Sequence, residues 1–314
     1  MIDSLPGFSG EPTSFTTNSI GFRGEELKDG ELKVFALGGS TTECIYLDDD
    51  EHWPHLLQQY FREAGMKINV QNAGKSGDAI DDHIAMTAHR LIHLEPDVII
   101  IYMGINDVFR LVCNRNPLKY DVEKDHLPVF KHCLSETQLY RRLHNILSEN
   151  GGKQQIGFES DYKDKVAYSN SFPLSDSVPS IDTAYFRKKV ELLFNICKNA
   201  SDATIYLIPQ LTTWETQDTL LKKHHWMNEI CGTRYRQNIL ADFMDELNKI
   251  ITKTCVKHGI NVVPVKIAPI SDYFYDDCHF NPKGAELFAQ QLHNYMKENI
   301  QIDTTHKGSL RAFD

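Results

Sequence analysis

Five short runs of apolar and β-branched residues recur along the chain and predict the strands of a buried sheet. Each run is continuously apolar rather than alternating with polar residues, as expected of parallel strands whose two faces are both covered. The predicted strands span residues 34–37, 68–71, 98–103, 204–208 and 261–265.

Amphipathic patterns with helical spacing lie between these runs. The predicted helices span residues 52–64, 79–93, 185–199, 233–258 and 282–299. Gly259 directly follows the fourth helix, at the position where a left-handed C-cap glycine is expected. The alternation of strands and helices indicates an α/β fold in which right-handed crossovers join the strands of a parallel, doubly wound sheet.

The spacing of the elements is uneven, because residues 108–182 contain no convincing core strand. One helix is expected there, in the sequence LSETQLYRRLHNIL, and the segment after it is rich in Gly, Ser, Asp and Pro. A long insertion at the carboxyl end of a strand predicts a cap over a pocket, with a decorative or oligomer-forming excursion as the alternative. We therefore expect an N-terminal arm (1–30) and one domain (31–314) that carries an insertion at about 108–182.

Four polar clusters interrupt this pattern. Three of them directly follow the first three predicted strands, and the fourth precedes the last helix: GGSTT (38–42), NAGKSGD (72–78), GIND (104–107) and DDCHFNPKG (276–284). The carboxyl ends of parallel strands meet at one edge of a sheet, so clusters far apart in the sequence are expected to converge there.

The residue types in these clusters match the requirements of acyl transfer. This chemistry needs an exposed hydroxyl, a base, a group that orients the base, and donors for the oxyanion. Ser40 is the candidate nucleophile, His279 the base, and Asp276, three residues earlier, the orienting carboxylate. The oxyanion donors are expected to be the backbone amides of Ser40 and Gly74 and the side-chain amide of Asn106.

Each of these residues has a simpler interpretation when it is taken alone. Ser40 has the residue type of a helix cap, and Asn106 that of a turn residue. Asp277 competes with Asp276 as the orienting carboxylate, and Cys278 is a weaker candidate nucleophile beside the base. The Gly-Lys-Ser of the second cluster is not a phosphate-binding loop, because residue 69 is asparagine where that motif has glycine.

The four clusters together resemble the SGNH (GDSL-type) hydrolase superfamily, whose blocks supply Ser, Gly, Asn and His. GGST, NAGKSG, GIND and DDCHFNPKG are similar to the four blocks and occur in the same order. The resemblance implies a three-layer α/β/α, flavodoxin-like sandwich with a five-stranded parallel sheet. It also implies a Ser40–His279–Asp276 triad with an oxyanion hole of Ser40, Gly74 and Asn106.

The chain departs from the common family pattern at its first block, which reads GGS where many members have GDS. The preceding NSIGFRGEE (18–26) is similar to a leader of bacterial members with a GGST block, many of which accompany surface-polysaccharide genes. This suggests a carbohydrate substrate. Arg23 in the leader is expected to pair with a carboxylate and fix the arm rather than reach the pocket.

Composition narrows the candidate functions further. The chain has 314 residues, a net charge of −10 and a pI near 5.8, which argues against nucleic acid as the main partner. It contains no apolar run long enough to span a membrane and no HExxH signature, so neither a metal nor another cofactor is expected. Seven scattered cysteines favour free thiols in a reducing compartment and hence a cytoplasmic protein, with a periplasmic or secreted one as the alternative.

These observations predict a serine esterase that hydrolyses a short-chain ester, most simply an acetyl ester, of a carbohydrate or other polar alcohol. An O-acyltransferase with the same triad is the first alternative, because a triad does not decide whether water or an alcohol accepts the acyl group. A non-catalytic binding module is the second. The oligomeric state is not predicted.

Overall fold

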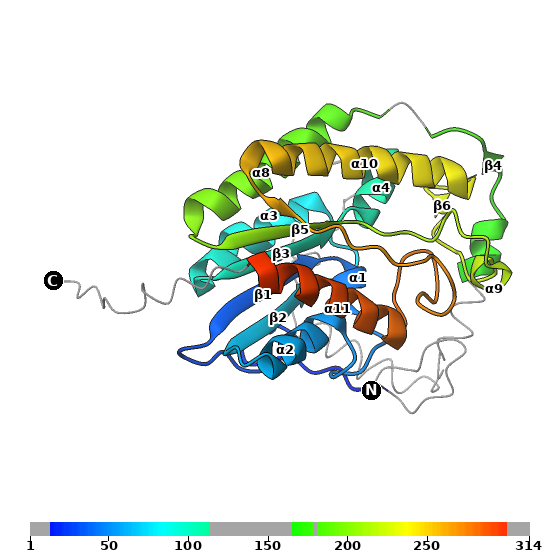
Figure 1. Ribbon diagram of the computed structural model, residues 1–314. Coiled ribbons are helices and arrows are strands. Elements are labelled where there is room, and N and C mark those ends of the chain that lie inside the picture. Colours follow the sequence, from blue (N-terminus) through cyan, green and yellow to red (C-terminus); the bar gives the residue numbers. More distant parts are fainter. Residues whose placement is uncertain (1–12, 114–164, 179–180, 300–314) are drawn as a thin grey trace, which may run out of the picture.

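A computed structural model describes residues 13–113, 165–178 and 181–299. Its centre is a five-stranded parallel sheet, as the apolar runs predicted, and the strand order in this sheet is β2-β1-β3-β5-β8 (Figure 1). The strands are β1 (Leu32–Gly38), β2 (Ile68–Gly74), β3 (Val98–Met103), β5 (Thr204–Pro209) and β8 (Asn261–Val262). β8 is shorter than the predicted run, because Pro264 has no backbone N–H with which to extend the ladder.

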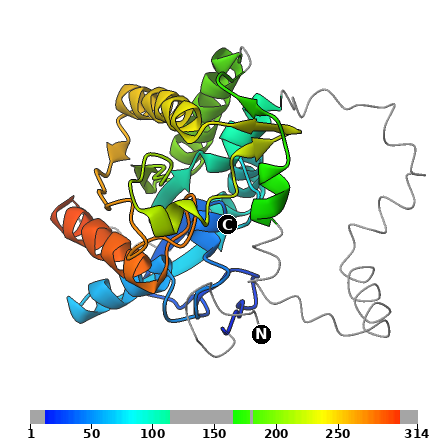
Figure 2. The same ribbon diagram turned by 90° about the vertical axis from the view of Figure 1, so that its right-hand side faces the viewer.

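Helices cover both faces of this sheet. One face carries α2 (Trp53–Glu63) and α11 (Pro282–Asn299), and the other carries α3 (Ile80–His89), α4 (Ile105–Val112), α8 (Thr183–Ala200) and α10 (Gln237–His258). Figure 2 shows the layers from the side, with blue α2 and red α11 on one side of the sheet and green α8 and yellow α10 on the other. The predicted three-layer α/β/α architecture is therefore confirmed.

The two helical layers explain why the strands are continuously apolar. Val34 and Ala36 of β1 point into the core under α2 and α11, whereas Phe35 and Leu37 point into the core under the other helices. All four side chains are buried, and complete burial of one large apolar side chain stabilises the fold by about 1.5–3 kcal/mol. A strand with polar residues on one face would lose half of this contribution.

The starts and ends of some predicted helices also differ in the structure. The helix predicted to begin at residue 233 begins at Gln237, because β7 (Thr233–Tyr235) forms a hairpin with β6 (Glu229–Ile230). Cys231 and Gly232, which join the two strands, both have positive φ, as a tight two-residue hairpin turn requires. α3 ends at His89 and a 3₁₀ helix, η1 (Leu91–Leu94), follows it, and helix α4, which begins within GIND, was not among the predicted helices.

The same hairpin belongs to a small second sheet in the order β4-β7-β6, in which β4 (Leu174–Ser175) comes from the predicted insertion. The first residues of that insertion lie in α4. The helix predicted within residues 134–147 lies outside the described residues, so the cap remains a prediction.

The cysteines depart from the expectation of free thiols throughout. Cys113, at the C-cap of α4, forms a disulfide with Cys231 in the β6–β7 turn, with 5.7 Å between the Cα atoms. Cys44, Cys197, Cys255 and Cys278 are free and buried. The disulfide links the C-terminal end of α4 to the turn of the β6–β7 hairpin in the second sheet.

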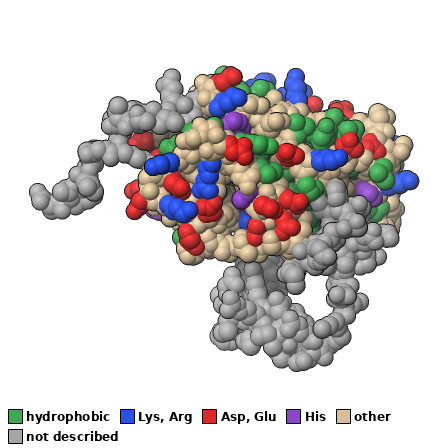
Figure 3. Space-filling model, turned by 60° about the horizontal axis from the view of Figure 1, so that its bottom comes forward, with side chains coloured by type: hydrophobic (Ala, Val, Ile, Leu, Met, Phe, Trp, Pro, Cys, Tyr) green, Lys and Arg blue, Asp and Glu red, His purple; other side chains and the backbone are tan. Residues whose placement is uncertain are grey.

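The surface of the protein carries charged side chains of both signs on the face shown in Figure 3. Figure 3 looks toward the lower side of Figure 1, and on it Asp and Glu side chains are interspersed with Lys and Arg. Among the described residues, no helix is long and apolar enough to cross a membrane.

Candidate active site

The first strand delivers Ser40 to the edge of the sheet. β1 ends at Gly38, and Ser40 is the first residue of the short helix α1 (Ser40–Glu43). The N-cap is Gly39, and no side chain caps the helix, so the Ser40 hydroxyl does not serve as a cap. The backbone amide of Ser40 lies in the first turn, where amides have no partner within the helix.

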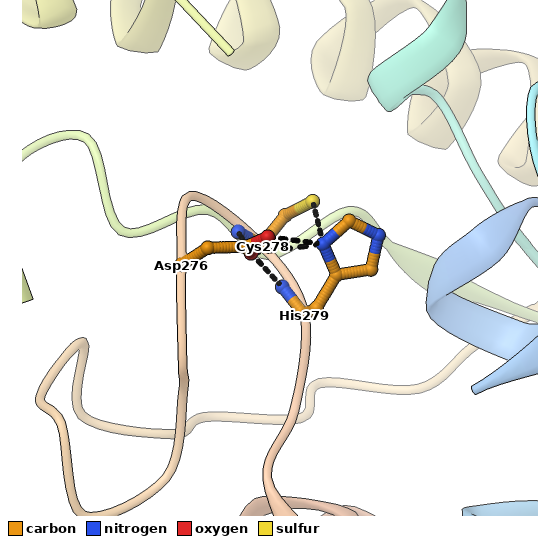
Figure 4. Close-up of side chains that lie close together, drawn as sticks. All are labelled: Asp276, Cys278 and His279. Carbon is orange, nitrogen blue, oxygen red and sulfur yellow. Dashed lines mark hydrogen bonds and ion pairs between the residues drawn. The ribbon is translucent and has the colours of Figure 1, made fainter. Parts of the chain in front are cut away.

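Ser40, His279 and Asp276 form a continuous hydrogen-bonded chain. Ser40 Oγ lies 2.8 Å from His279 Nε2, although 239 residues separate them in the sequence. The other ring nitrogen, Nδ1, lies 2.8 Å from each carboxylate oxygen of Asp276. Figure 4 shows Nδ1 turned toward Asp276 and the remaining ring nitrogen pointing away from it. The three side chains that the sequence grouped as a candidate triad therefore lie in a row, each within hydrogen-bonding distance of the next.

The loop around His279 holds the imidazole ring in place. Asp276 Oδ1 accepts hydrogen bonds from the backbone amides of Cys278 and His279, at 3.0 and 2.9 Å. Tyr275 stacks on the imidazole with ring centroids 5.5 Å apart and an interplanar angle of 12°. Its amide also donates to the His279 carbonyl, which closes the loop. Three residues of separation are therefore enough for Asp276 to orient His279 without help from another element.

The charges of the pair shift both pKa values. Burial disfavours the imidazolium of His279, but the charge and hydrogen bond of Asp276 outweigh burial and raise the pKa of His279 above its ordinary value. Burial would raise the pKa of the Asp276 carboxyl, but the charge of His279 and its hydrogen bonds outweigh burial and lower it. Asp276 therefore remains ionised beside a ring that can accept a proton from Ser40.

The two adjacent aspartates, Asp276 and Asp277, have different hydrogen-bond partners. The Asp277 carboxylate bonds other groups: its Oδ1 accepts from the Trp214 indole at 2.8 Å, and its Oδ2 accepts from the backbone amides of Trp226 and Met227. Burial raises the pKa of the Asp277 carboxyl. The geometry therefore places Asp276, and not Asp277, as the partner of the ring.

Asn106 comes to the site from the end of the third strand. It lies in the first turn of α4, and its Nδ2 donates to the backbone carbonyl of Asp78 at 2.8 Å. A Cβ atom on Gly39 would lie only 2.8 Å from this nitrogen, so the amide packs directly over the residue before Ser40. An amide nitrogen carries two hydrogens, and one of them remains for a substrate oxygen.

Gly74 does not fit the oxyanion role that the sequence predicted. Its amide donates to Asn72 Oδ1 at 3.0 Å, and a Cβ atom on it would lie 2.4 Å from the backbone nitrogen of Glu43. Gly74 thus allows β2 and the end of α1 to approach closely. Sequence reasoning passed over Gly77, which has positive φ in the turn that leads to Asp78. A glycine in a polar turn just after a strand is the signal for such a position.

Cys278 is poorly placed for a nucleophile. Its Sγ lies 3.7 Å from His279 Nδ1, the nitrogen that faces Asp276, and burial raises the pKa of the thiol well above its usual range. Asp276, Cys278 and His279 lie close enough together to surround a cation (Figure 4). The Nδ1 atom is already hydrogen-bonded to Asp276, however, and a buried thiol that keeps its proton is a poor metal ligand.

Two buried side chains, Arg23 and Trp53, hold the backbone next to the site in place. Arg23 pairs with Asp49 at 2.9 Å and donates to the backbone carbonyls of Glu43, Cys44 and Leu47, so it fixes the arm and the loop after α1, as expected. Trp53, at the start of α2, donates its indole N–H to the carbonyl of Thr41, the residue after the predicted nucleophile.

A small hollow adjoins Ser40 and His279. Its cavity volume is only about 10 Å³, and it is lined by Ser40, Thr41, Cys44, Tyr46, Leu47, Tyr275, His279 and Phe280. Pockets that bury a drug-sized ligand are larger, roughly 300–1,000 Å³. The space beside the hydroxyl therefore suits a small group.

Known proteins with related sequences were compared with the chain. An arylesterase of Vibrio mimicus is 31% identical over 78 residues, which are 25% of this chain and 39% of the relative, so the chain spans less than half of that protein. Among solved structures, LAE5, an α/β hydrolase enzyme from the metagenome of Lake Arreo in Spain, is 14% identical with a TM-score of 0.49 and covers 87% of this chain and 97% of its own. Axe2, an acetylxylan esterase of Geobacillus stearothermophilus, is 16% identical with a TM-score of 0.47 and covers 84% and 93%.

The family described as GDSL-like Lipase/Acylhydrolase has a sequence model that matches residues 34–292, from the first strand to the last helix. The match contains Ser40, Asn106, Asp276 and His279, the residues that the fold brings to one edge of the sheet. The chain belongs to the GDSL-like lipase/acylhydrolase family.

Proposed function

We propose that the protein is a serine esterase that hydrolyses a short-chain ester, foremost an acetyl ester, of a carbohydrate or another polar alcohol. The observation that carries the proposal is the 2.8 Å contact between Ser40 Oγ and His279 Nε2, continued at 2.8 Å from Nδ1 to Asp276. A hydroxyl, a base and an orienting carboxylate in this order are the parts that acyl transfer requires. The GGS of the first block also leads us to place the chain in the GGST-type bacterial branch.

The proposed reaction has two steps. Ser40 Oγ attacks the ester carbonyl carbon while its proton passes to His279 Nε2, and the protonated ring then donates that proton to the departing alcohol oxygen. In the second step His279 takes a proton from water, the hydroxide attacks the acyl-enzyme carbonyl, and Ser40 regains its proton as the acid leaves. Asp276 stays ionised throughout and stabilises the imidazolium.

The negative oxygen of each tetrahedral intermediate needs donors. We assign this role to the amide of Ser40 and the side chain of Asn106, which packs against Gly39. In place of Gly74, the turn that contains Gly77 is the proposed source of a further amide, because its Asp78 carbonyl holds Asn106 in position.

The small hollow beside Ser40 is the reason for proposing a short acyl group in the substrate. Its walls include Tyr46, Leu47 and Tyr275, and its small cavity volume of about 10 Å³ disfavours a long acyl chain beside Ser40. The alcohol portion is expected on the open side of the site. We assign a polar alcohol because the chain has a net charge of −10, which disfavours anionic lipid surfaces.

A serine-directed fluorophosphonate tests the nucleophile. The wild type is expected to be labelled and to hydrolyse aryl acetate, whereas Ser40→Ala loses both properties. Ser76→Ala is the matched control, because Ser76 is an exposed serine at the same sheet edge that bonds Glu43 instead of a histidine. Labelling of the Ser40→Ala protein at the wild-type rate would overturn the proposal. Product analysis with a sugar acceptor separates hydrolysis from the acyltransferase alternative.

A further inference from the structure

The Asp276 carboxylate has a donor that does not belong to its own loop. The indole N–H of Trp226, 50 residues away in the sequence, donates to Asp276 Oδ2 at 3.1 Å. On the other oxygen, Oδ1, two backbone amides of the loop donate at 3.0 and 2.9 Å. The carboxylate is therefore held at both oxygens while both face His279 Nδ1.

Asp277 fixes the position of Trp226. Its Oδ2 accepts from the backbone amides of Trp226 and Met227, at 2.8 and 3.0 Å, and its Oδ1 accepts from the indole of Trp214. Asp277 is fully buried, so these bonds form away from water, where they hold the segment firmly. Two adjacent carboxylates thus divide the work: Asp277 anchors the Trp226 segment, and Trp226 reaches back to Asp276.

We propose that Trp226 is a positioning residue of the catalytic triad, whose indole N–H fixes the Asp276 carboxylate in the orientation that aligns His279 with Ser40. The inference rests on the proposed esterase function and deepens it. Trp226 does not touch the reacting atoms; it acts through Asp276.

Geometry supplies the first reason. The terminal torsion of an aspartate is broad, so a carboxylate that is held only on one side can rotate. The backbone amides restrain Oδ1, and Trp226 restrains Oδ2. Without the indole N–H, Oδ2 can swing out of line with Nδ1 and the imidazole loses part of its orientation.

The second reason is electrostatic, and it predicts the direction in which the pKa of His279 shifts when the indole donor is lost. A hydrogen bond from Trp226 disperses part of the Asp276 charge, so its loss lets that charge act more strongly on the ring and stabilises the imidazolium. The other charges that act on His279 are Asp277, which raises its pKa, and Lys165, which lowers it. Lys165 also lies over the Trp226 ring, with Nζ 4.9 Å from the centroid. Replacement by phenylalanine keeps an aromatic ring for this contact and removes only the indole donor.

The experiment compares Trp226→Phe with Trp214→Phe. Both variants remove an indole N–H from a buried aspartate, but the first bond goes to Asp276 and the second to Asp277. For each variant we measure kcat and KM on aryl acetate, the pH profile of kcat/KM, the fluorophosphonate labelling rate of Ser40 and the melting temperature.

We expect Trp226→Phe to lower kcat by about tenfold, with KM nearly unchanged, and to move the acidic midpoint of kcat/KM to higher pH. Trp214→Phe is expected to lower the melting temperature and to move the midpoint less than Trp226→Phe does, because the charge of Asp277 acts on His279 less strongly than that of Asp276. A Trp226→Phe enzyme with the wild-type kcat and midpoint would overturn the inference, and so would the same midpoint shift in both variants. A wild type that neither turns over the ester nor labels at Ser40 would instead refute the proposed function.

Discussion

Asn106 and Asp78 are joined by a hydrogen bond from the side-chain amide of the first to the backbone carbonyl of the second, at 2.8 Å. The bond links the residues after β3 to the turn after β2 and leaves the amide packed over Gly39. Three strand ends are thereby tied together next to Ser40. The donor that we assign to the oxyanion is preorganised before any substrate arrives.

Replacement of Asn106 by alanine is expected to lower kcat by roughly 10²–10³, because removal of one oxyanion donor has that effect in comparable sites. KM should change little, since the charge on the oxygen develops only in the transition state. Steady-state kinetics on aryl acetate measure both. Asn294→Ala on α11, which loses only a bond from Lys297, serves as the control. A wild-type kcat in Asn106→Ala would remove this residue from the oxyanion hole.

Activity is expected to fall in acid, with the midpoint of kcat/KM above pH 6.5. Burial would lower the pKa of His279, but the neighbouring Asp276 raises it above 6.5, and only the neutral ring can take the proton from Ser40. Below that pKa the base is already protonated and the rate falls. In Asp276→Asn the carboxylate charge is lost, so we expect a much lower kcat and a midpoint at lower pH. A wild-type midpoint below pH 6 would contradict the assignment.

Asp107 gives a prediction about stability. Its side chain is buried, Oδ1 accepts from the amide of Ile80, and Oδ2 receives no hydrogen bond from the described residues. Burial raises the pKa of this carboxyl from 3.8 to about 7. The folded state therefore holds the proton more tightly than the unfolded state, and this contribution to stability is lost as the pH rises from about 4 to about 7.

Asp107→Asn keeps the acceptor for Ile80 and removes the charge. The variant should gain stability relative to the wild type, and the gain should be larger at pH 8 than at pH 5 by about 1–3 kcal/mol. Urea denaturation at the two pH values measures the difference. Equal differences at both pH values would show that Asp107 does not titrate in this range.

Reduction of the Cys113–Cys231 disulfide is expected to destabilise the fold. The bond closes a loop between residues 118 apart in sequence, and loss of such a cross-link costs about 2–4 kcal/mol. Cys113→Ser should show the same loss and then be insensitive to reductant, which distinguishes this bond from other effects of the reagent. Peptide mapping without reduction should recover the two cysteines as one linked pair.

The hollow beside Ser40 predicts selectivity for short acyl chains. Tyr46 forms part of its wall and meets Tyr275 edge to face, with ring centroids 6.2 Å apart. Tyr46→Ala should widen the space and raise the ratio of butyryl to acetyl ester hydrolysis, measured as relative kcat/KM on an aryl ester series. Tyr60→Ala, on α2 and outside the hollow, provides the comparison. An unchanged ratio would place the acyl group elsewhere.

Much of the site follows from the sequence because strand ends converge. Once residues 34–37, 68–71 and 98–103 are recognised as parallel strands, Ser40 and Asn106 must meet, and Asp276 reaches His279 across a three-residue loop. Gly74 was predicted as an oxyanion donor from its place at a strand end, but the direction of an amide there depends on the turn that follows. The Gly74 amide donates to Asn72 Oδ1, and Gly77, which has positive φ, lies in the turn that leads to Asp78.

Other features of the structure could not be predicted from local sequence patterns. Trp226 lies on a loop without periodicity, 50 residues before its partner, and only the packed structure reveals its bond to Asp276. The pairing of Cys113 with Cys231 is likewise beyond spacing rules, since seven scattered cysteines permit many pairings. Residues 233–235, the second strand of the β6–β7 hairpin, were predicted as helix because they directly precede the amphipathic pattern of α10.

All three tryptophans of the chain direct their indole N–H groups to this site: Trp53 to the Thr41 carbonyl, Trp214 to Asp277 and Trp226 to Asp276. The intrinsic fluorescence of the protein therefore arises almost entirely from around its triad. Acylation of Ser40, titration of His279 and entry of a ligand become events that emission can follow without an added dye. The protein carries its own optical reporter of the acyl-enzyme.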